Sequence, residues 1–401
     1  MQTITSLFAF DGPSRCELWE VLVPRIAPAP LLPRLQAVGF RPDRSRRKLV
    51  AGSFYLLSRT VTSLEYGGRE YDNPLIRSAL TRAFDFAPGI EKVRLPVQPW
   101  EDIYTLGDRV NHVEINPEVE PKRLLYLAKF PHLRSLSISL GVYFNLGGDE
   151  FACPLLDRLR VTGDWTNVTA LLNDTTAPNL HVISLEIWQR GAPPQQVAQY
   201  VTECLTTIST KYPSLTSLTV FANSGCPPLS YGYARKIPIV EDTSQVSLLD
   251  ILRPILALRS LRTLTLSLPN YLDIHSSSED LRAMSEAWPS LEALHVTIWD
   301  YFTRKGLPEH PSAGECRARG GPFAALAHFA RNCPRLRTLH LPPMDATQLG
   351  VDDALQSHYA HGLESLFISK LKVGAEGDNS DQSTERVAEF VRSVFPVAAW
   401  V

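Results

Sequence analysis

Histidine and cysteine are the residue types in this sequence whose spacing could indicate catalytic or metal chemistry. His358 and His361 are three residues apart on a helical pattern, but the glutamate of a His-Glu-x-x-His zinc motif is missing. The six cysteines show no Cys-x-x-Cys spacing, so neither a zinc site nor a disulfide framework is indicated. We therefore expect reduced thiols and no metal ligands.

Motifs of common catalytic sites are also missing. The sequence has no Gly-x-Ser-x-Gly elbow, no phosphate-binding loop ending in Gly-Lys-Ser/Thr, and no Gly-x-Gly-x-x-Gly fingerprint. The pairs Gly147-Gly148 and Gly320-Gly321 fit turns rather than phosphate cradles. We predict no catalytic residues, no cofactor and no enzymatic activity. An enzyme on an atypical α/β sheet stays as a third hypothesis and would need a closed pocket with convergent polar groups.

A repeated apolar pattern must position the side chains of this chain. Apolar residues at positions 1, 4 and 6 recur in twelve units, whose first positions are Leu35, Val61, Ile90, Val110, Leu133, Leu156, Leu180, Leu215, Leu261, Leu291, Leu336 and Leu363. Proline stands two residues before the first position in eight units, where its frequency of 31 in 401 residues predicts about one. Because proline ends a preceding helix, each unit indicates a helix, a stop and a strand.

The spacing within and between units indicates the fold class. Positions 4 and 6 alternate as in a strand with one buried face, and strands that are each reached through a helix run parallel. Eight of the eleven spacings between units fall at or near the 20 to 29 residues of a leucine-rich repeat, whose core is Leu-x-x-Leu-x-Leu. We expect an α/β fold, a leucine-rich repeat solenoid curved into a horseshoe, with one parallel β-sheet on the concave side and helices on the convex side.

The same pattern predicts the domain organisation. Residues 1–30 are expected to form an N-terminal lead-in or cap, and residues 31–401 one irregular repeat domain of about twelve units. Insertions interrupt the period near 222–245, 301–321 and 372–383, and loops of this length are usually functional or disordered. Further expectations are helices over 121–128, 195–210, 246–258, 323–333 and 384–395, a helix that begins at Ser277 or Ser278, and a thirteenth strand that begins within 396–401.

Composition and charge exclude several classes of partner. A formal net charge of -2 provides no global basic field for nucleic acid or an anionic membrane. No run of about 18 apolar residues is present to span a bilayer, and residues 1–10 lack the basic and apolar regions of a signal peptide. We therefore expect a protein partner, no nucleic acid and no membrane contact, and a cytoplasmic or nuclear location.

The concave face of the predicted sheet is the expected binding surface. Its first half carries mixed charges, whereas its second half carries mostly hydroxyl, histidine and aromatic side chains. His295 and His340 occupy equivalent positions on adjacent strands, but no third or fourth metal ligand shares their register. The rings of Trp188 and Trp299 are expected at the rim with Phe221 between them, unless the chain itself covers each ring. The predicted partner-binding residues are Glu186, Trp188, Phe221, His295, Thr297, Trp299, His340 and Phe367.

The repeat units resemble the leucine-rich repeat region of fungal F-box proteins. The resemblance rests on Phe-Pro-x-Leu-Arg-x-Leu at Phe130 to Leu136, on Cys-Pro-x-Leu at Cys153 and Cys333, and on Trp-Pro-x-Leu at Trp288. It implies that the repeats hold a substrate while an F-box docks the chain on a Skp1-type adaptor of a ubiquitin ligase. Residues 1–30 contain no Leu-Pro-x-Glu run of the kind that opens an F-box.

Two hypotheses follow from these observations. The first is a non-enzymatic protein-binding module, most plausibly substrate recognition of the F-box type through the concave face. The alternative is a repeat protein that scaffolds or inhibits an enzyme without any link to ubiquitin.

Overall fold

A computed structural model describes most of the predicted repeat units, in two compact parts. The described residues are 6–10, 34–41, 59–66, 84–85, 87–95, 109–142, 144–188, 194–223, 246–269, 272, 274–299, 321–347, 349, 361–373, 380–396 and 399–400. Unit 1 comprises Met1–Val161 and Asp174–Leu180, and unit 2 comprises Thr162–Asn173 and His181–Val401. A single repeat domain over 31–401 therefore stays a prediction.

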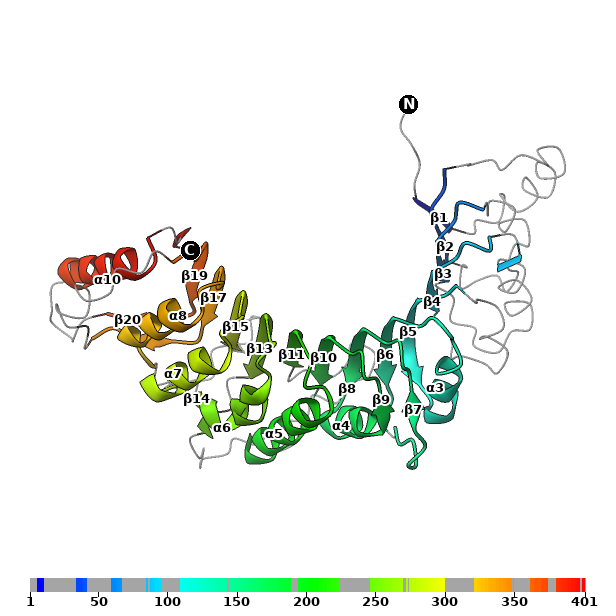
Figure 1. Cartoon of the computed structure of the whole chain (residues 1–401), viewed down its shortest axis with the longest axis horizontal. Coiled ribbons are helices and arrows are strands. Elements are labelled where there is room, and N and C mark those ends of the chain that lie inside the picture. Colours follow the sequence, from blue (N-terminus) through cyan, green and yellow to red (C-terminus); the bar gives the residue numbers. More distant parts are fainter. Residues whose placement is uncertain are drawn as a thin grey trace, which may run out of the picture. The chain divides into compact units, whose positions relative to one another are not determined.

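Unit 1 contains parallel strands in sequential order (Figure 1). They are β1 (Ser6–Phe10), β2 (Ala37–Arg41), β3 (Ser63–Tyr66), β4 (Lys92–Leu95), β5 (His112–Val119), β6 (Ser135–Leu140) and β8 (Arg158–Gly163), at the division between the units. The register of β5 against β6 shifts between Ile115 and Glu118, so the pairing of the two strands is interrupted there. The helix α3 (Pro121–Leu127) connects β5 to β6 along the chain, as the sequence predicted.

Unit 2 repeats this arrangement with more helix. Its strands are β10 (Val182–Trp188), β11 (Ser217–Asn223), β13 (Thr263–Pro269), β15 (Ala293–Trp299), β17 (Thr338–Leu341), β19 (Ser365–Ile368) and β21 (Ala399–Trp400). They are neighbours in that order, and the pairs from β10 to β21 are parallel. The pairing of β21 with β19 confirms the thirteenth strand.

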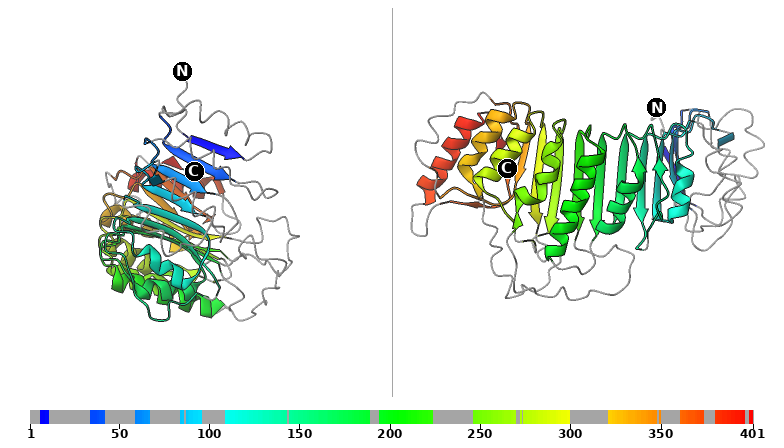
Figure 2. Two further views of the ribbon diagram at one scale, coloured as in Figure 1. Left: turned by 90° about the vertical axis from the view of Figure 1, so that its right-hand side faces the viewer. Right: turned by 60° about the horizontal axis from the view of Figure 1, so that its bottom comes forward.

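The helices of unit 2 lie on one side of its sheet (Figures 1 and 2). They are α4 (Trp165–Asp174), α5 (Pro194–Lys211), α6 (Leu248–Leu252) with the 3-10 helix η3 (Arg253–Ala257), α7 (Ser278–Ala287), the 3-10 helix η5 (Phe323–Ala325) with α8 (Leu326–Asn332), and α10 (Ser380–Val394). The α/β architecture with parallel strands is therefore confirmed. None of the described helices combines the length and the hydropathy that crossing a lipid bilayer requires.

Burial of the repeat positions explains why these elements form. All twelve first positions are at most 2% exposed, from Leu35 to Leu363. The strand positions behind them alternate between buried and half-buried, for example from Ser135 to Leu140. Each repeat unit therefore contributes one apolar side chain at the start of its strand, and two or more along the strand, to the core of the compact unit in which it lies.

Shared backbone carbonyls connect successive repeat units at the start of their strands. The carbonyl of Thr216 accepts hydrogen bonds from the amides of Arg262 and Thr263, at 2.8 and 3.1 Å. We call the run of such doubly accepting carbonyls the carbonyl staircase. Its steps are Gln36, Thr62, Glu91, Asn111 and Arg134 in unit 1, and His181, Thr216, Arg262, Glu292 and Arg337 in unit 2. No side-chain ladder is needed to hold the repeats in register, because the backbone does so.

Helix starts and stops follow the local residues. Ser277 caps α7, since its hydroxyl accepts from the amide of Asp280 while the Asp280 carboxylate accepts from the amide of Ser277. Pro254 lies where α6 gives way to the 3-10 helix η3, because proline removes a helical hydrogen bond. The positive φ angles of Gly147 and Gly148, 68° and 89°, confirm the predicted turn.

Several elements were not predicted. The strand β1 pairs in register with β2, so residues 6–10 extend the sheet of unit 1. The helix α4 lies between the repeat units that begin at Leu156 and Leu180, whose short spacing predicted little helix. Short parallel strands also lie outside the main sheet: β7 (Phe151–Ala152) with β9 (Thr175–Thr176), β12 (Val246–Ser247) with β14 (Ile274–His275), and β16 (Gly321–Pro322) with β18 (Met344–Asp345) and β20 (Leu371–Lys372). Most of the three predicted insertions lies outside the described residues.

Candidate functional site

The sheet of unit 2 presents a face whose side chains alternate with the buried core positions. Residues that share a register position on neighbouring strands form rows across this face. We call the central row, which runs over six strands, the histidine row: Ser184, Thr219, Thr265, His295, His340 and Phe367. All six residues are half-buried. The sequence predicted the composition of this row.

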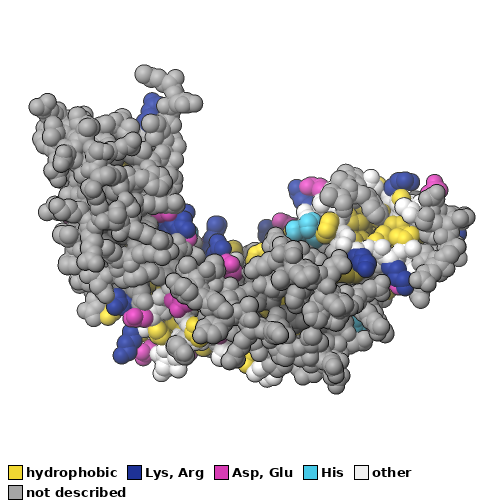
Figure 3. All heavy atoms as spheres, turned by 180° about the vertical axis from the view of Figure 1, so that it is seen from behind, with side chains coloured by type: hydrophobic (Ala, Val, Ile, Leu, Met, Phe, Trp, Pro, Cys, Tyr) yellow, Lys and Arg dark blue, Asp and Glu magenta, His cyan; other side chains and the backbone are white. Residues whose placement is uncertain are grey.

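One end of the histidine row is aromatic. The ring centroids of His295 and His340 are 4.2 Å apart, with an angle of 37° between the ring planes. The ring of Phe367 follows at 5.3 Å from that of His340. Histidine side chains adjoin hydrophobic ones on the face seen in Figure 3. The structure therefore brings together three of the predicted binding residues.

Burial keeps both histidines of this cluster neutral. It lowers the pKa of His340, and it lowers the pKa of His295 together with the charge that His340 would carry. Each ring is thus uncharged at neutral pH and has one unprotonated nitrogen. Formal charge is sparse on this face, because Glu186 is the one ionised side chain among the described residues of the histidine row and of the row beside it.

A second row runs beside the histidine row and contains three more predicted residues. In order they are Glu186, Phe221, Ser267 and Thr297. Phe221 is 45% exposed and is one of two exposed large hydrophobic residues among those described, Leu155 in unit 1 being the other at 40%. A phenylalanine exposed between polar neighbours on a regular sheet has no role in the core.

The structure corrects the prediction for Trp188. This residue is 5% exposed, so it does not lie exposed at the rim. Ile187 and Trp188 are both buried at the end of β10, and Leu268 and Pro269 are both buried at the end of β13, so alternation stops where both faces of a strand are covered. Trp299 lies opposite Pro269 in the sheet, and its side chain is outside the described residues.

The corresponding face of unit 1 differs in charge. Arg94 lies between two carboxylates in one row, 3.5 Å from Glu65 and 3.2 Å from Glu114. The pKa of His112 is lowered by burial and then by the nearby charge of Lys92. The predicted contrast between a charged first half and a mostly uncharged second half is thus confirmed among the described residues.

The structure gives no support to nucleophilic chemistry at the described thiols. Cys153, Cys204 and Cys333 are buried and form no disulfide, and burial raises the pKa of each thiol to about 12. A thiol with so high a pKa is protonated at neutral pH and is a poor nucleophile. The other three cysteines lie outside the described residues. Within the described ranges no three His, Cys, Asp or Glu side chains are placed to hold a metal ion.

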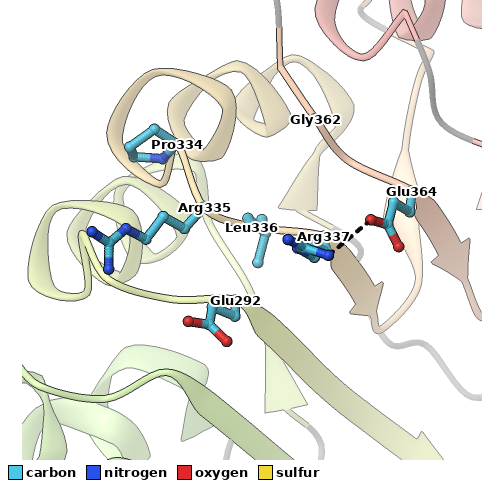
Figure 4. A pocket seen from close by; sticks show the side chains of 7 residues that line it. All are labelled: Glu292, Pro334, Arg335, Leu336, Arg337, Gly362 and Glu364. Carbon is cyan, nitrogen blue, oxygen red and sulfur yellow. Dashed lines mark hydrogen bonds and ion pairs between the residues drawn. The ribbon is translucent and has the colours of Figure 1, made fainter.

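A groove at the strand entrances of unit 2 was not predicted. It has a volume of about 520 Å³ and is lined by Glu292, Pro334, Arg335, Leu336, Arg337, Gly362 and Glu364. In Figure 4, Arg335 and Arg337 lie on opposite sides of Leu336, and a hydrogen-bonded ion pair of 3.3 Å joins Arg337 to Glu364. Two arginines and two glutamates give the groove no net charge, and its polar side chains are not buried, so it has no feature of a catalytic site.

The signal for this groove was present in the sequence. The residue after the first apolar position alternates in charge over four units, as Arg262, Glu292, Arg337 and Glu364. These positions are the carbonyl staircase and its continuation, where adjacent side chains meet. The Arg262 and Glu292 side chains are 3.7 Å apart, and such exposed pairs contribute little to stability.

Comparison with known proteins adds no family. No protein-family model matches this sequence, and no curated protein is significantly similar to it. A crystal structure of a protein from Bacteroides fragilis shows 11% sequence identity and a TM-score of 0.33, over 82% of this chain and 73% of that chain. A TM-score this low carries neither a fold family nor a function to this chain.

Proposed function

We propose that this chain is a non-enzymatic protein-binding protein of the leucine-rich repeat type, which contacts its partner through the sheet face of unit 2. The observation that carries the proposal is the exposure of Phe221 beside the histidine row. A monomer gains nothing from an exposed phenylalanine on a regular sheet, whereas aromatic side chains are enriched at interfaces. The proposal includes the curved horseshoe form in which such sheets are concave.

The chemistry of the face supports protein rather than small-molecule binding. Hydroxyl, imidazole and aromatic groups spread over six strands instead of converging on one pocket. Such groups combine apolar contact area with hydrogen-bonding capacity at low electrostatic cost. We expect Phe221, His340 and Phe367 to contact the partner, with Glu186 and Thr297 beside them.

The more specific part of the proposal is substrate recognition of the F-box type. It is supported by the resemblance of the Pro-x-Leu-x-x-Leu units to fungal F-box proteins and by no comparison with known proteins. The second candidate, a scaffold or inhibitor without any link to ubiquitin, uses the same face. Pull-down of a Skp1-type adaptor with the full chain distinguishes the two, because a folded chain that does not associate refutes the F-box function.

The binding face itself is tested by a matched pair of variants. We expect Phe221→Ala to weaken the partner about 30-fold, or about 2 kcal/mol, because an exposed aromatic anchor loses its contacts only in the complex. Leu155→Ala removes a similarly exposed apolar side chain outside this face and should change nothing. Affinity purification with mass spectrometry, followed by binding measurements on the captured protein, compares the two. Equal capture by both variants and the unaltered chain contradicts the proposal.

A further inference from the structure

The ring nitrogens of His295 and His340 form no hydrogen bond with any other described residue. Their centroids are 4.2 Å apart, yet among the described residues neither ring takes part in a hydrogen bond or an ion pair. Paired histidines in a fold usually satisfy a nitrogen with a carbonyl or a carboxylate, as His361 does with the carbonyl of Cys333 at 2.8 Å. Two adjacent imidazoles without such partners have free lone pairs on the same face of the sheet.

The surroundings of this pair suit a cation. The neighbouring positions of the histidine row are Thr265 and Phe367, and Ala293 and Thr338 lie two positions earlier on the same two strands. No lysine or arginine occupies these positions. The register of β15 with β17 is described only from Ala293 to His295, which places the two histidines at the last paired position.

We propose that His295 and His340 together bind a divalent transition-metal ion of the zinc or copper class. Neutral imidazole nitrogens suit these ions, whereas magnesium and calcium prefer oxygen ligands. Water completes the coordination in the isolated chain, so the inference does not depend on the proposed partner.

The distance between the rings fits two-point ligation. With zinc–nitrogen bonds of about 2.0–2.1 Å, two rings that bind one ion have centroids roughly 4.5–5 Å apart. The observed 4.2 Å is short of this range by a few tenths of an ångström. Both rings are half-buried, so small rotations about the side-chain torsions can open the pair to the required separation.

The inference differs from a structural zinc site. From the sequence we expected no closed set of four protein ligands. Within the described ranges the structure has no group of three side chains that could hold a metal ion. A two-histidine site is open, binds more weakly and exchanges its ion with the solvent. It would therefore add no folding stability of the kind that a four-ligand site contributes.

Calorimetric titration of the full chain with Zn²⁺ tests the site. We expect an ion to bind that His295→Ala or His340→Ala weakens at least about tenfold, while His132→Ala, which removes an exposed histidine outside this face, leaves binding unchanged. Mg²⁺ should produce no comparable heat. Unchanged Zn²⁺ binding by the His295→Ala, His340→Ala double variant overturns the inference.

A measurement on the unaltered chain covers variants that fail to fold. Nuclear magnetic resonance should show the ring protons of His295 and His340 changing together on the first additions of Zn²⁺. If other histidines respond and these two do not, the inference is wrong. Either outcome leaves the proposed partner binding to be decided by Phe221→Ala, because that residue takes no part in ligation.

Discussion

Trp188 and Phe221 are aromatic residues on neighbouring strands and differ widely in exposure, at 5% and 45%. The register places Phe221 opposite Glu186 within the paired region, while Trp188 is the last residue of β10. Alternation along a strand predicts the face toward which a side chain points, but not whether another segment covers that face. Strand parity therefore located Phe221 correctly and failed for Trp188.

The burial of Trp188 leads to a stability prediction. Trp188→Ala removes a large buried side chain and should lower the free energy of unfolding by about 3–5 kcal/mol. Phe221→Ala, on the exposed side of the next strand, should lower it by less than about 1 kcal/mol. Urea unfolding followed by circular dichroism compares the variants, and equal losses would show that the two environments are wrongly distinguished.

His112 leads to a prediction of pH dependence in unit 1. Burial and the charges of Lys92 and Arg158 lower its pKa from 6.5, against the opposing charge of Glu114. Between the lowered value and 6.5 the unfolded chain binds more protons than the folded one, so stability should fall as the pH falls through 6.5.

The thermal midpoint of the chain measures this effect. The midpoint should decrease between pH 7 and pH 5.5, and it should decrease less in His112→Gln, which cannot be protonated. Identical pH profiles for this variant and the unaltered chain would remove His112 as a contributor.

At the scale of elements, the start of α7 connects two helices. The Asp280 carboxylate accepts from the amide and the hydroxyl of Ser277, and also from the hydroxyl of Ser247, the N-cap of α6, at 3.1 Å. Asp280 is 5% exposed, whereas Ser247 and Ser277 are half-buried. One carboxylate thus satisfies the caps of two successive helices.

The loss of this carboxylate should be costly. Asp280→Ala should destabilise the chain by about 1–2 kcal/mol, because the half-buried donors of two helix caps lose their acceptor. Glu279→Ala removes the adjacent exposed carboxylate, which pairs with Arg282 at 2.7 Å, and should leave stability nearly unchanged. Thermal unfolding of both variants gives the comparison, and an unaffected Asp280→Ala variant would show that the shared cap is dispensable.

The sequence predicted most of the elements but fewer of the contacts. The apolar triplets, eight of them led by proline, placed the strands of the main sheet from β2 to β19, because proline and a buried leucine act locally on the backbone. The amphipathic pattern located α5, which spans Pro194–Lys211 against the predicted 195–210. The strand β1 and the short outer strands escaped, since their partners are distant in sequence and their own patterns are too short to be distinctive.

At the scale of the whole molecule, the repeated units supply a common framework with different surfaces. The ion pairs of Arg94 lie on unit 1, and the uncharged histidine row lies on unit 2. The residues of a row come from segments far apart in the sequence. Because the units repeat in register, the composition of each face could nevertheless be predicted from the sequence. The alternating charges at the entrance groove can likewise be read in the sequence. The ring distances and the volume of the groove could not be predicted, because they depend on side-chain torsions.

The carbonyl staircase determines how such a chain would respond to mechanical load. Each step holds two amides of the following unit by a single oxygen, as Arg262 does for Glu292 and Ala293. A force that detaches one end of the sheet would therefore break both hydrogen bonds of a step at once. The chain between that step and the next would then extend before the next pair of hydrogen bonds bears the force. Extension should proceed in discrete jumps of unequal length, long where a unit carries an insertion and short where the repeats are compact.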